Sequence, residues 1–184
     1  MVTKRPSELE LVGGDPALLL INTHDGVRGG EPTADYVTTA EDLVAWAARA
    51  GFPRPDDPAA GLEDFRRLRA VMYPIFWALA DGREPPAAAL AELAAIHAGA
   101  LAGARLLPRD GGFDYAPAFV LTAAQAAVDL LRGGPLDRLK ACADCRWVFI
   151  DRSRNRSRVW CSMNECGGRL KMQRYRARRA TAGR

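Results

Sequence analysis

The sequence predicts a mainly α-helical N-terminal domain with one small β-hairpin, followed by a small C-terminal module containing a knuckle, a β-hairpin and a helix. Three observations support this division. Apolar residues recur with a helical period through most of the first 134 residues. The run Gly133-Gly134-Pro135 then interrupts the pattern. All four cysteines and an excess of arginine follow this run. We therefore place one domain at residues 1–134 and a second at 135–184.

Helices in the first domain are indicated by apolar stripes and by the residues that flank them. The predicted spans are about 39–50, 58–79, 86–102 and 117–132. Thr39 and Asp57 are suitable N-caps, and Pro58 suits a first helical position. Gly51 should end the first of these helices. Pro74 should bend the second near its last turns, because proline removes a backbone donor.

Two segments outside these helices have other patterns. Residues 104–115 contain short apolar pieces around Pro108, Asp110 and Gly111, which is typical of a β-hairpin. The apolar stretch 18–23 is too short to distinguish a helix from a strand.

Charge is distributed unevenly along the chain, although the total is only +4. Residues 135–184 hold 14 Lys or Arg against 4 Asp or Glu, which leaves 12 cations and 18 anions in residues 1–134. The second domain is therefore strongly basic and the first is acidic. This asymmetry favours a polyanion as the partner of the basic part.

Membrane insertion and secretion are not indicated. No stretch approaches the roughly 18 consecutive apolar residues of a membrane span. The first ten residues carry charges with no apolar segment behind them, which differs from a secretory signal. We therefore expect a cytoplasmic protein that does not contact a membrane.

The cysteines have the spacing of a metal site. They form a Cys-x2-Cys pair and a Cys-x4-Cys pair separated by fifteen residues, and they are Cys142, Cys145, Cys161 and Cys166. Two such pairs can surround one Zn2+ as a tetrahedron of thiolates, which leaves no open position and makes the metal structural. The alternative is that they are buried free cysteines without a metal. The pairing and the basic surroundings favour zinc.

Zinc would also provide the folding free energy that a module of this size lacks. Residues 147–150 and 159–160 are apolar, and we predict that they form two short strands joined by the turn 151–158. After Cys166 a helix should run through the basic tail. Its uncharged stripe would be Leu170, Gln173, Ala177 and Ala180.

The basic residues of this module fit nucleic acid. Arginine occupies every second position from 152 to 158, so in an extended chain these side chains would all point to one side. A helix with a cationic face fits the major groove of DNA, and arginine binds phosphate and guanine through a bidentate fork. The predicted nucleic-acid contacts are Arg152, Arg154, Arg156, Arg158, Arg169, Lys171, Arg174, Tyr175, Arg176 and Arg178. The alternative is a solvated or disordered tail.

At these residues the chain resembles the bacterial CGNR zinc-finger proteins, a family of stress-induced transcription regulators. The matching residues include Cys142-x2-Cys145, Arg158-x-Trp160-Cys161-Ser162-Met163 and Cys166-Gly167-x-Arg169. Gly168 replaces the asparagine of the family's motif, so the role of that position is not carried over. The helical part is also similar to the family's accompanying ABATE-type domain. The resemblance implies a helical sensor or dimerisation domain fused to a DNA-binding finger associated with the nucleoid.

A polar cluster in the first domain is the candidate for binding a small-molecule effector. It consists of Asn22, His24, Asp25 and Arg28. No nucleophile with an orienting third group accompanies it, so we expect no enzymatic activity. A structural role for the cluster is the competing interpretation. His97 is interpreted as a core or boundary residue.

Three functional hypotheses follow from these patterns. The first is a zinc-dependent regulator that binds duplex DNA, with a helical domain that senses a small-molecule effector or forms a homodimer. The second is an RNA- or ribosome-associated zinc protein, because arginine and aromatic side chains can stack on exposed bases. The third is a zinc module whose basic face binds an acidic protein surface.

Overall fold

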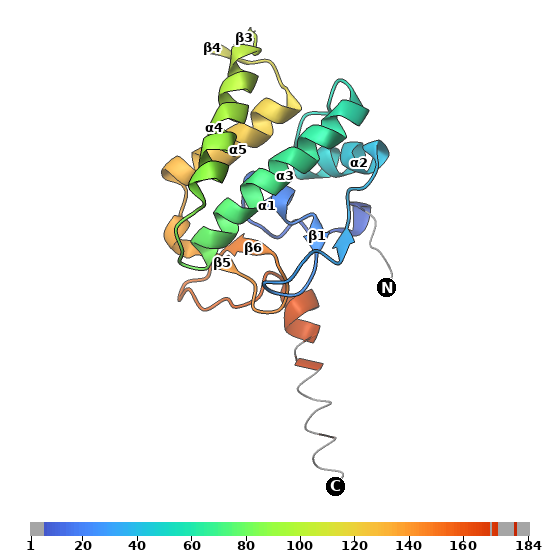
Figure 1. The fold of residues 1–184 in the computed structure, drawn as a ribbon, viewed down its shortest axis with the longest axis vertical. Helices are drawn as coiled ribbons and strands as arrows, with labels where there is room; N and C mark the ends of the chain where they lie inside the picture. The colour runs from blue at the N-terminus through green and yellow to red at the C-terminus, as the bar shows by residue number, and fades with distance from the viewer. Residues whose placement is uncertain (1–5, 170, 173–178, 180–184) are drawn as a thin grey trace.

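Five α-helices form the body of the protein in the part of the chain that the computed structural model describes, which is residues 6–169, 171–172 and 179 (Figure 1). They are α1 (Pro16–Ile21), α2 (Ala40–Ala50), α3 (Pro58–Ala80), α4 (Ala87–Ala102) and α5 (Phe119–Gly133). Short 3-10 helices, η1 (Pro6–Glu8) and η2 (Leu136–Arg138), lie before α1 and after α5. The helix α3 packs against α1, α2, α4 and α5 and is the centre of the body.

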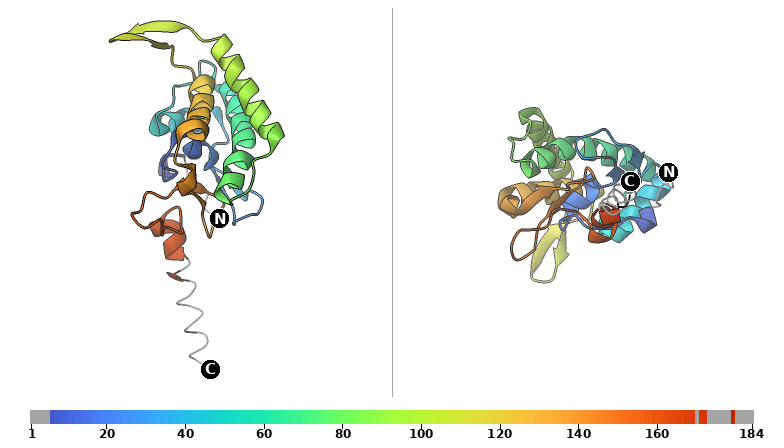
Figure 2. Two further views of the ribbon diagram at one scale, coloured as in Figure 1. Left: turned by 90° about the vertical axis from the view of Figure 1, so that its left-hand side faces the viewer. Right: turned by 90° about the horizontal axis from the view of Figure 1, so that it is seen from below.

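Three two-stranded antiparallel sheets accompany the helices in this described part. The pairs are β1 (His24–Asp25) with β2 (Ala34–Asp35), β3 (Leu106–Arg109) with β4 (Gly112–Tyr115), and β5 (Leu139–Ala141) with β6 (Val148–Ile150). The β3–β4 hairpin projects from one end of the molecule, whereas β5, β6 and the last described helical turn lie at the opposite end (Figures 1 and 2).

The predicted helix boundaries are confirmed where local chemistry sets them. The hydroxyl of Thr39 accepts from the backbone N–H of Asp42, whose carboxylate accepts in return from the backbone N–H of Thr39. Gly51 ends α2 with a left-handed φ of 78°. Asp57 caps α3, which continues through Pro74 to Ala80. The ambiguous stretch 18–23 belongs largely to α1.

Large aromatic side chains form the centre of the helical core. Trp46 stacks on Phe52 with ring centroids 5.1 Å apart and meets the edge of Phe65 at 5.2 Å. Phe119 of α5 contacts both phenylalanines. Burial of such side chains is the main source of folding free energy. The helix α4 is different, because Leu93 is its one fully buried residue.

The C-terminal module shares this core. Val148, Phe149 and Ile150 of β6 are buried in the same apolar cluster as the residues of α1 and α3. The hydroxyl of Tyr73 on α3 donates to the backbone oxygen of Arg146 at 2.9 Å. The packing is therefore continuous across Gly133-Gly134-Pro135.

The predicted pairing of residues 147–150 with 159–160 is wrong. The partner of β6 is β5, with Leu139 opposite Ile150 and Ala141 opposite Val148. The turn of this hairpin is the first cysteine pair, where the backbone N–H of Cys142 donates to the oxygen of Trp147 at 2.8 Å. The sequence Leu139–Ala141 is too short to show a strand pattern, so the partner strand was not recognisable.

Candidate metal centre and the basic surface beside it

The four cysteine sulfurs form one buried cluster. All four Sγ atoms lie within 4.8 Å of one another, and all four residues are buried. Cys161 is at the centre, with its Sγ 3.6 Å from that of Cys145 and 3.7 Å from that of Cys166. A tetrahedral zinc with bonds of about 2.3 Å holds its sulfurs about 3.8 Å apart. The cluster therefore fits one zinc ion, as the spacing predicted.

The second cysteine pair is positioned by a wide helical turn. The π-helix η3 (Met163–Gly167) contains Cys166, and its N-cap Ser162 accepts from the backbone N–H of Glu165 at 3.3 Å. The backbone N–H of Gly167 donates to the oxygen of Ser162, five residues earlier, at 3.0 Å. This turn brings Cys166 back to Cys161 across a four-residue gap. The helix begins before Cys166, not after it as predicted, because Ser162 caps it.

The charge state of the sulfurs favours a bound cation. The hydrogen bonds shared with Cys142, together with burial, raise the pKa of Cys145 and Cys161. Hydrogen bonds with the neighbouring cysteines lower the pKa of Cys142 and Cys166, so the four sulfurs compete for protons. Four thiolates in this volume therefore require a positive charge between them. Zinc supplies that charge, and four thiolate ligands complete its coordination shell.

Arg169 lies in contact with the metal ligands. Its Nη2 donates to the Sγ of Cys166 at 3.3 Å, and its Nε donates to Asp144 at 2.8 Å. Asp144 stands between the first two cysteines, so this arginine joins both halves of the site. Hydrogen bonds of this kind orient metal ligands. About half of the Arg169 side chain remains exposed.

The helical body supports the knuckle directly. Val27 forms an isolated β-bridge with Cys145, and the backbone N–H of Arg28 donates to the oxygen of Asp144 at 3.1 Å. The guanidinium of Arg28 donates to the backbone oxygens of Ala141 and Cys142 and pairs with Asp81 of the α3 C-cap at 2.9 Å. The metal site thus depends on residues more than 100 positions earlier in the chain.

The other residues of the proposed effector cluster also lie at this junction. The side chain of Asn22 bonds the backbone of Val148, and the carbonyl oxygen of His24 accepts from Trp147 Nε1 at 2.6 Å. Burial and the charge of Arg69 lower the pKa of His24 to about 4, so its imidazole is neutral at neutral pH. Asp25 accepts from the backbone N–H of the next residue.

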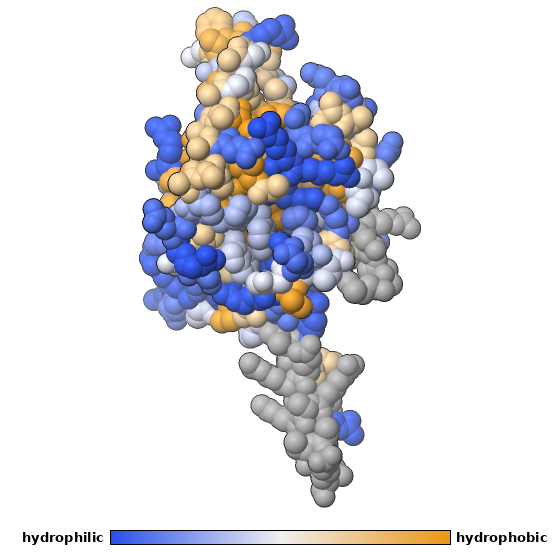
Figure 3. All heavy atoms as spheres, in the orientation of Figure 1, coloured by the Kyte–Doolittle hydropathy of each residue, from blue (hydrophilic) through white to orange (hydrophobic). Residues whose placement is uncertain are grey.

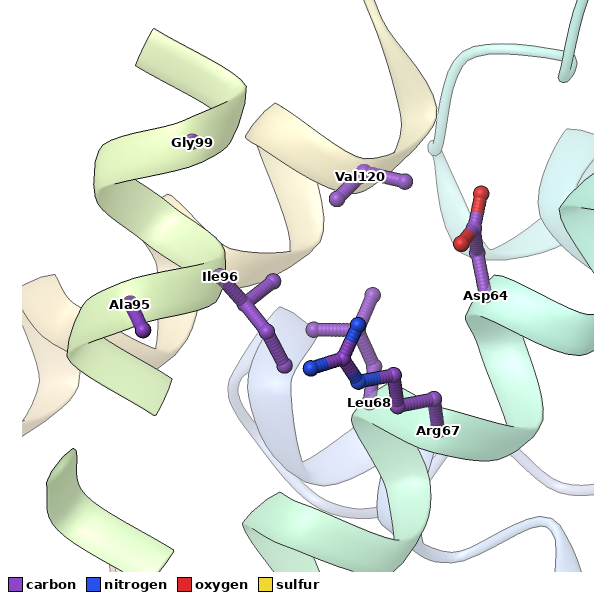
Figure 4. A pocket seen from close by; sticks show the side chains of 7 residues that line it. All are labelled: Asp64, Arg67, Leu68, Ala95, Ile96, Gly99 and Val120. Atoms are coloured by element: carbon purple, nitrogen blue, oxygen red, sulfur yellow. The ribbon is translucent and has the colours of Figure 1, made fainter. Parts of the chain in front are cut away.

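A cavity of about 280 Å3 lies elsewhere, between α3, α4 and α5 (Figure 4). Its lining consists of Asp64, Arg67, Leu68, Ala95, Ile96, Gly99 and Val120. None of the four residues of the effector cluster contributes to it. The effector therefore stays a prediction.

The arginines of residues 151–158 do not form the extended run that the sequence predicted. Arg152 donates to the backbone oxygen of Gly14 at 3.0 Å, and Arg156, in a left-handed conformation with φ of 51°, pairs with Asp137 at 2.8 Å. The prediction of a single arginine face is wrong because the chain turns at residues 153–156. Arg154 is exposed.

Buried Asp151 is the main reason that residues 151–158 fold into a compact loop instead of an extended run. Its carboxylate accepts from Lys140 Nζ at 2.7 Å and from the backbone N–H groups of Ser153 and Arg158 at 2.9 and 3.0 Å. Burial opposes ionisation, but these hydrogen bonds outweigh it and hold the pKa of Asp151 well below its usual range. The loop is therefore folded around one carboxylate, which sequence patterns did not reveal.

Arg158 is a structural residue of the finger. Its guanidinium lies 4.7 Å from the ring centroid of Phe149 and donates to the backbone oxygens of Trp160 and Cys161. Sequence reasoning also missed Arg146, whose guanidinium lies 4.4 Å from the Tyr73 ring centroid and donates to the Gly30 oxygen at 2.7 Å. Neither arginine is distinguishable by sequence from its exposed neighbours.

The tail contributes two further exposed cations among the predicted contacts, Arg169 and Lys171. The predicted contacts Arg174, Tyr175, Arg176 and Arg178 lie outside the described residues. The same holds for the predicted stripe of Leu170, Gln173, Ala177 and Ala180. The segment that contains the described cations of the finger lies at the end of the molecule opposite the β3–β4 hairpin (Figure 1).

The fold and the sulfur cluster define a protein with a helical N-terminal body and a zinc finger built into its C-terminal end. Residues 14–134 match the ABATE family model, described as "Putative stress-induced transcription regulator". Residues 138–179 match the CGNR zinc finger. The chain belongs to the ABATE family, as the resemblance indicated. A comparison with curated proteins found no match. No helix in the described residues is both long and apolar enough to cross a membrane.

Proposed function

We propose that this protein is a transcription regulator that binds duplex DNA through its zinc finger. The observation that carries the proposal is the contact of Arg169 with Cys166. Because this arginine bonds both Asp144 and the metal ligand Cys166 and is about half exposed, the metal site holds a cation in a fixed position at the molecular surface. A rigidly held arginine loses less freedom on binding phosphate than a mobile one.

Neighbouring residues extend this cationic surface. Arg152 and Arg154 are exposed, and the ion pair of Arg156 with Asp137 has both side chains more than half exposed. An ion pair exposed to this degree contributes little free energy, so Arg156 can exchange its partner for a phosphate. Arg158 is excluded from this set because its guanidinium is used inside the finger. The predicted contacts Arg174, Tyr175, Arg176 and Arg178, outside the described residues, belong to the same proposal.

In this role the protein binds DNA and has no catalytic activity. A zinc ion with four sulfur ligands has no open position for a substrate or an activated water. DNA binding would take place in the cytoplasm, on the nucleoid. A response to a small-molecule effector is also part of the proposal.

Binding by the zinc-loaded chain should be measured by fluorescence anisotropy with duplex DNA, single-stranded DNA and RNA over a range of salt concentrations. If about six phosphates are neutralised, the logarithm of the binding constant should fall with a slope near −5 against the logarithm of salt concentration. Preference for RNA would favour a ribosome-associated role. A flat salt response would favour an acidic protein partner.

The sequence specificity of binding requires a second measurement. Fragments retained from a random duplex library by the zinc-loaded protein should contain an enriched motif. A library that shows no enrichment, despite tight and salt-dependent binding, would indicate a general DNA-binding protein and contradict the role of a regulator.

A further inference from the structure

The β3–β4 hairpin has one face that is apolar throughout. Leu106 lies opposite Tyr115 and Pro108 lies opposite Phe113, and alternation along each strand places these four side chains on the same face. The other face carries the ion pair of Arg109 with Asp114. In antiparallel sheets, this alternation of apolar and polar faces is typical of strand pairs whose apolar face packs against another surface.

That apolar face is exposed in the single chain. Phe113 is 71% exposed, Leu106 is 60% exposed and Tyr115 is 46% exposed. The hairpin projects beyond the helices, and apolar atoms gather at this end of the molecule in the space-filling view (Figures 2 and 3). Exposed aromatic and aliphatic groups concentrated on one element mark an interaction surface.

Opposite charges at the two ends of the hairpin are complementary to those of a second, antiparallel copy. Arg105 precedes the hairpin at its base, and Asp110 lies in the two-residue turn at its tip. Both residues are exposed, and neither side chain has a partner in the described part of the chain. They are separated by five residues, or about 16 Å along an extended strand. A second hairpin lying antiparallel places its anionic tip level with the cationic base of the first. Alternation puts Arg105 on the Leu107 side, so its long side chain reaches that tip around the edge of the strand.

We infer that the β3–β4 hairpin is a dimerisation arm that packs its apolar face antiparallel against the same face of a second copy. A two-fold axis makes this contact self-complementary, with Arg105 of each copy beside Asp110 of the other. The apolar face itself carries no charge, so packing it against itself buries no unpaired ion. The neighbouring helix α4 has Glu92 as its single charged residue and can extend the same contact.

Sedimentation velocity of the zinc-loaded full chain across a concentration series tests this inference. The protein should sediment as a dimer that dissociates on dilution. Phe113→Glu places a charge in the apolar face and should raise the dimer dissociation constant by about tenfold or more. Leu107→Glu is the matched control, because Leu107 is exposed on the opposite face of the same strand pair and should leave the dimer intact.

A charge exchange tests the antiparallel arrangement. Arg105→Asp and Asp110→Arg should each weaken the dimer, since each places like charges together. The double variant should restore it. Rescue of this kind requires that the partner is another copy of the same chain, so an unrelated protein or a lipid surface would not produce it.

Three results would overturn the inference. They are a monomer at all concentrations, equal dissociation by Leu107→Glu and Phe113→Glu, and a double variant as weak as the two single variants. Binding of the monomer to lipid vesicles through Phe113 would assign the arm to a membrane surface instead. Circular dichroism should show that Phe113→Glu leaves the fold unchanged, because this side chain is mostly exposed.

Discussion

The side-chain amide of Asn22 bonds both backbone groups of Val148, which lies 126 residues later in the chain. Its Nδ2 donates to the Val148 oxygen at 2.8 Å, and its Oδ1 accepts from the Val148 N–H at 2.9 Å. Both residues are buried. One asparagine thus continues the hydrogen bonding of β6 into the helical body, on the side of the strand that β5 does not cover.

Asn22→Ala is expected to destabilise the whole protein by about 2–4 kcal/mol, because it leaves a buried backbone donor and a buried acceptor unsatisfied. Denaturant unfolding followed by circular dichroism measures this change. Asn155→Ala, at an exposed position, is the control and should change the free energy of unfolding by no more than about 0.5 kcal/mol. Similar values for the two variants would contradict the structural role of Asn22.

Cys145→Ser should abolish stoichiometric zinc binding and lower the melting temperature of the helical body as well as that of the finger. Structural zinc contributes about 10–16 kcal/mol to folding in small fingers, and here β6 shares its core with α1 and α3. Metal analysis and thermal melts provide the two measurements. The exposed control Ser157→Ala should retain one zinc per chain. A Cys145→Ser protein that keeps its zinc would contradict the four-sulfur site.

Asp35→Asn should cost about 3 kcal/mol, because it leaves the guanidinium of buried Arg69 without its counter-ion. Burial raises the pKa of Asp35, but the hydrogen bond and charge of Arg69 outweigh this effect, so the pKa lies below its ordinary value. The stabilisation by ionised Asp35 is therefore complete above the unfolded-state pKa, near 4, and is lost as pH falls through the lower folded-state pKa.

The pH dependence of this pair is measured as the difference in unfolding free energy between the wild type and Asp35→Asn. It should be constant above about pH 5 and should shrink below about pH 4. Loss of zinc in acid affects both proteins, so it cancels in the difference. A difference that increased toward low pH would show that the sign of the pKa shift is wrong.

Arg154→Glu should weaken duplex DNA binding by about tenfold and make the salt slope less steep by about 1, as expected when a phosphate contact is lost. Anisotropy titrations at several salt concentrations measure both quantities. Arg54→Glu introduces the same charge change in the exposed loop before α3 and should leave binding unchanged. Equal losses for the two variants would show that total charge, rather than the finger surface, determines binding.

Local chemistry made much of the fold predictable from the sequence. Thr39, Gly51 and Asp57 act within one helical turn, so their effects on helix ends follow from residue type. The cysteine spacing was sufficient to predict the metal cluster. Two closely spaced pairs of cysteines are typical of a zinc site, whereas cysteines buried for packing alone do not require such pairs. The hairpin at residues 104–115 followed from its turn residues in the same way.

Long-range contacts explain what the sequence did not reveal. Pairing of β5 with β6 depends on the knuckle between them, and the folded loop depends on buried Asp151. Arg158 and Arg154 are the same residue type in the same basic segment, yet one lies over Phe149 and the other is exposed. Only tertiary structure separates a cation that stabilises the finger from one that is available to a partner.

The finger is supported by hydrogen bonds from Asn22 and Arg28, which lie near the other end of the sequence. A fusion protein that transferred residues 135–184 to an unrelated scaffold would lose these supports and expose the apolar side of β6. Transfer of this finger between proteins would therefore have to include residues 22–28 as well. We therefore expect that the zinc finger and the segment that contains Asn22 and Arg28 were inherited together during evolution.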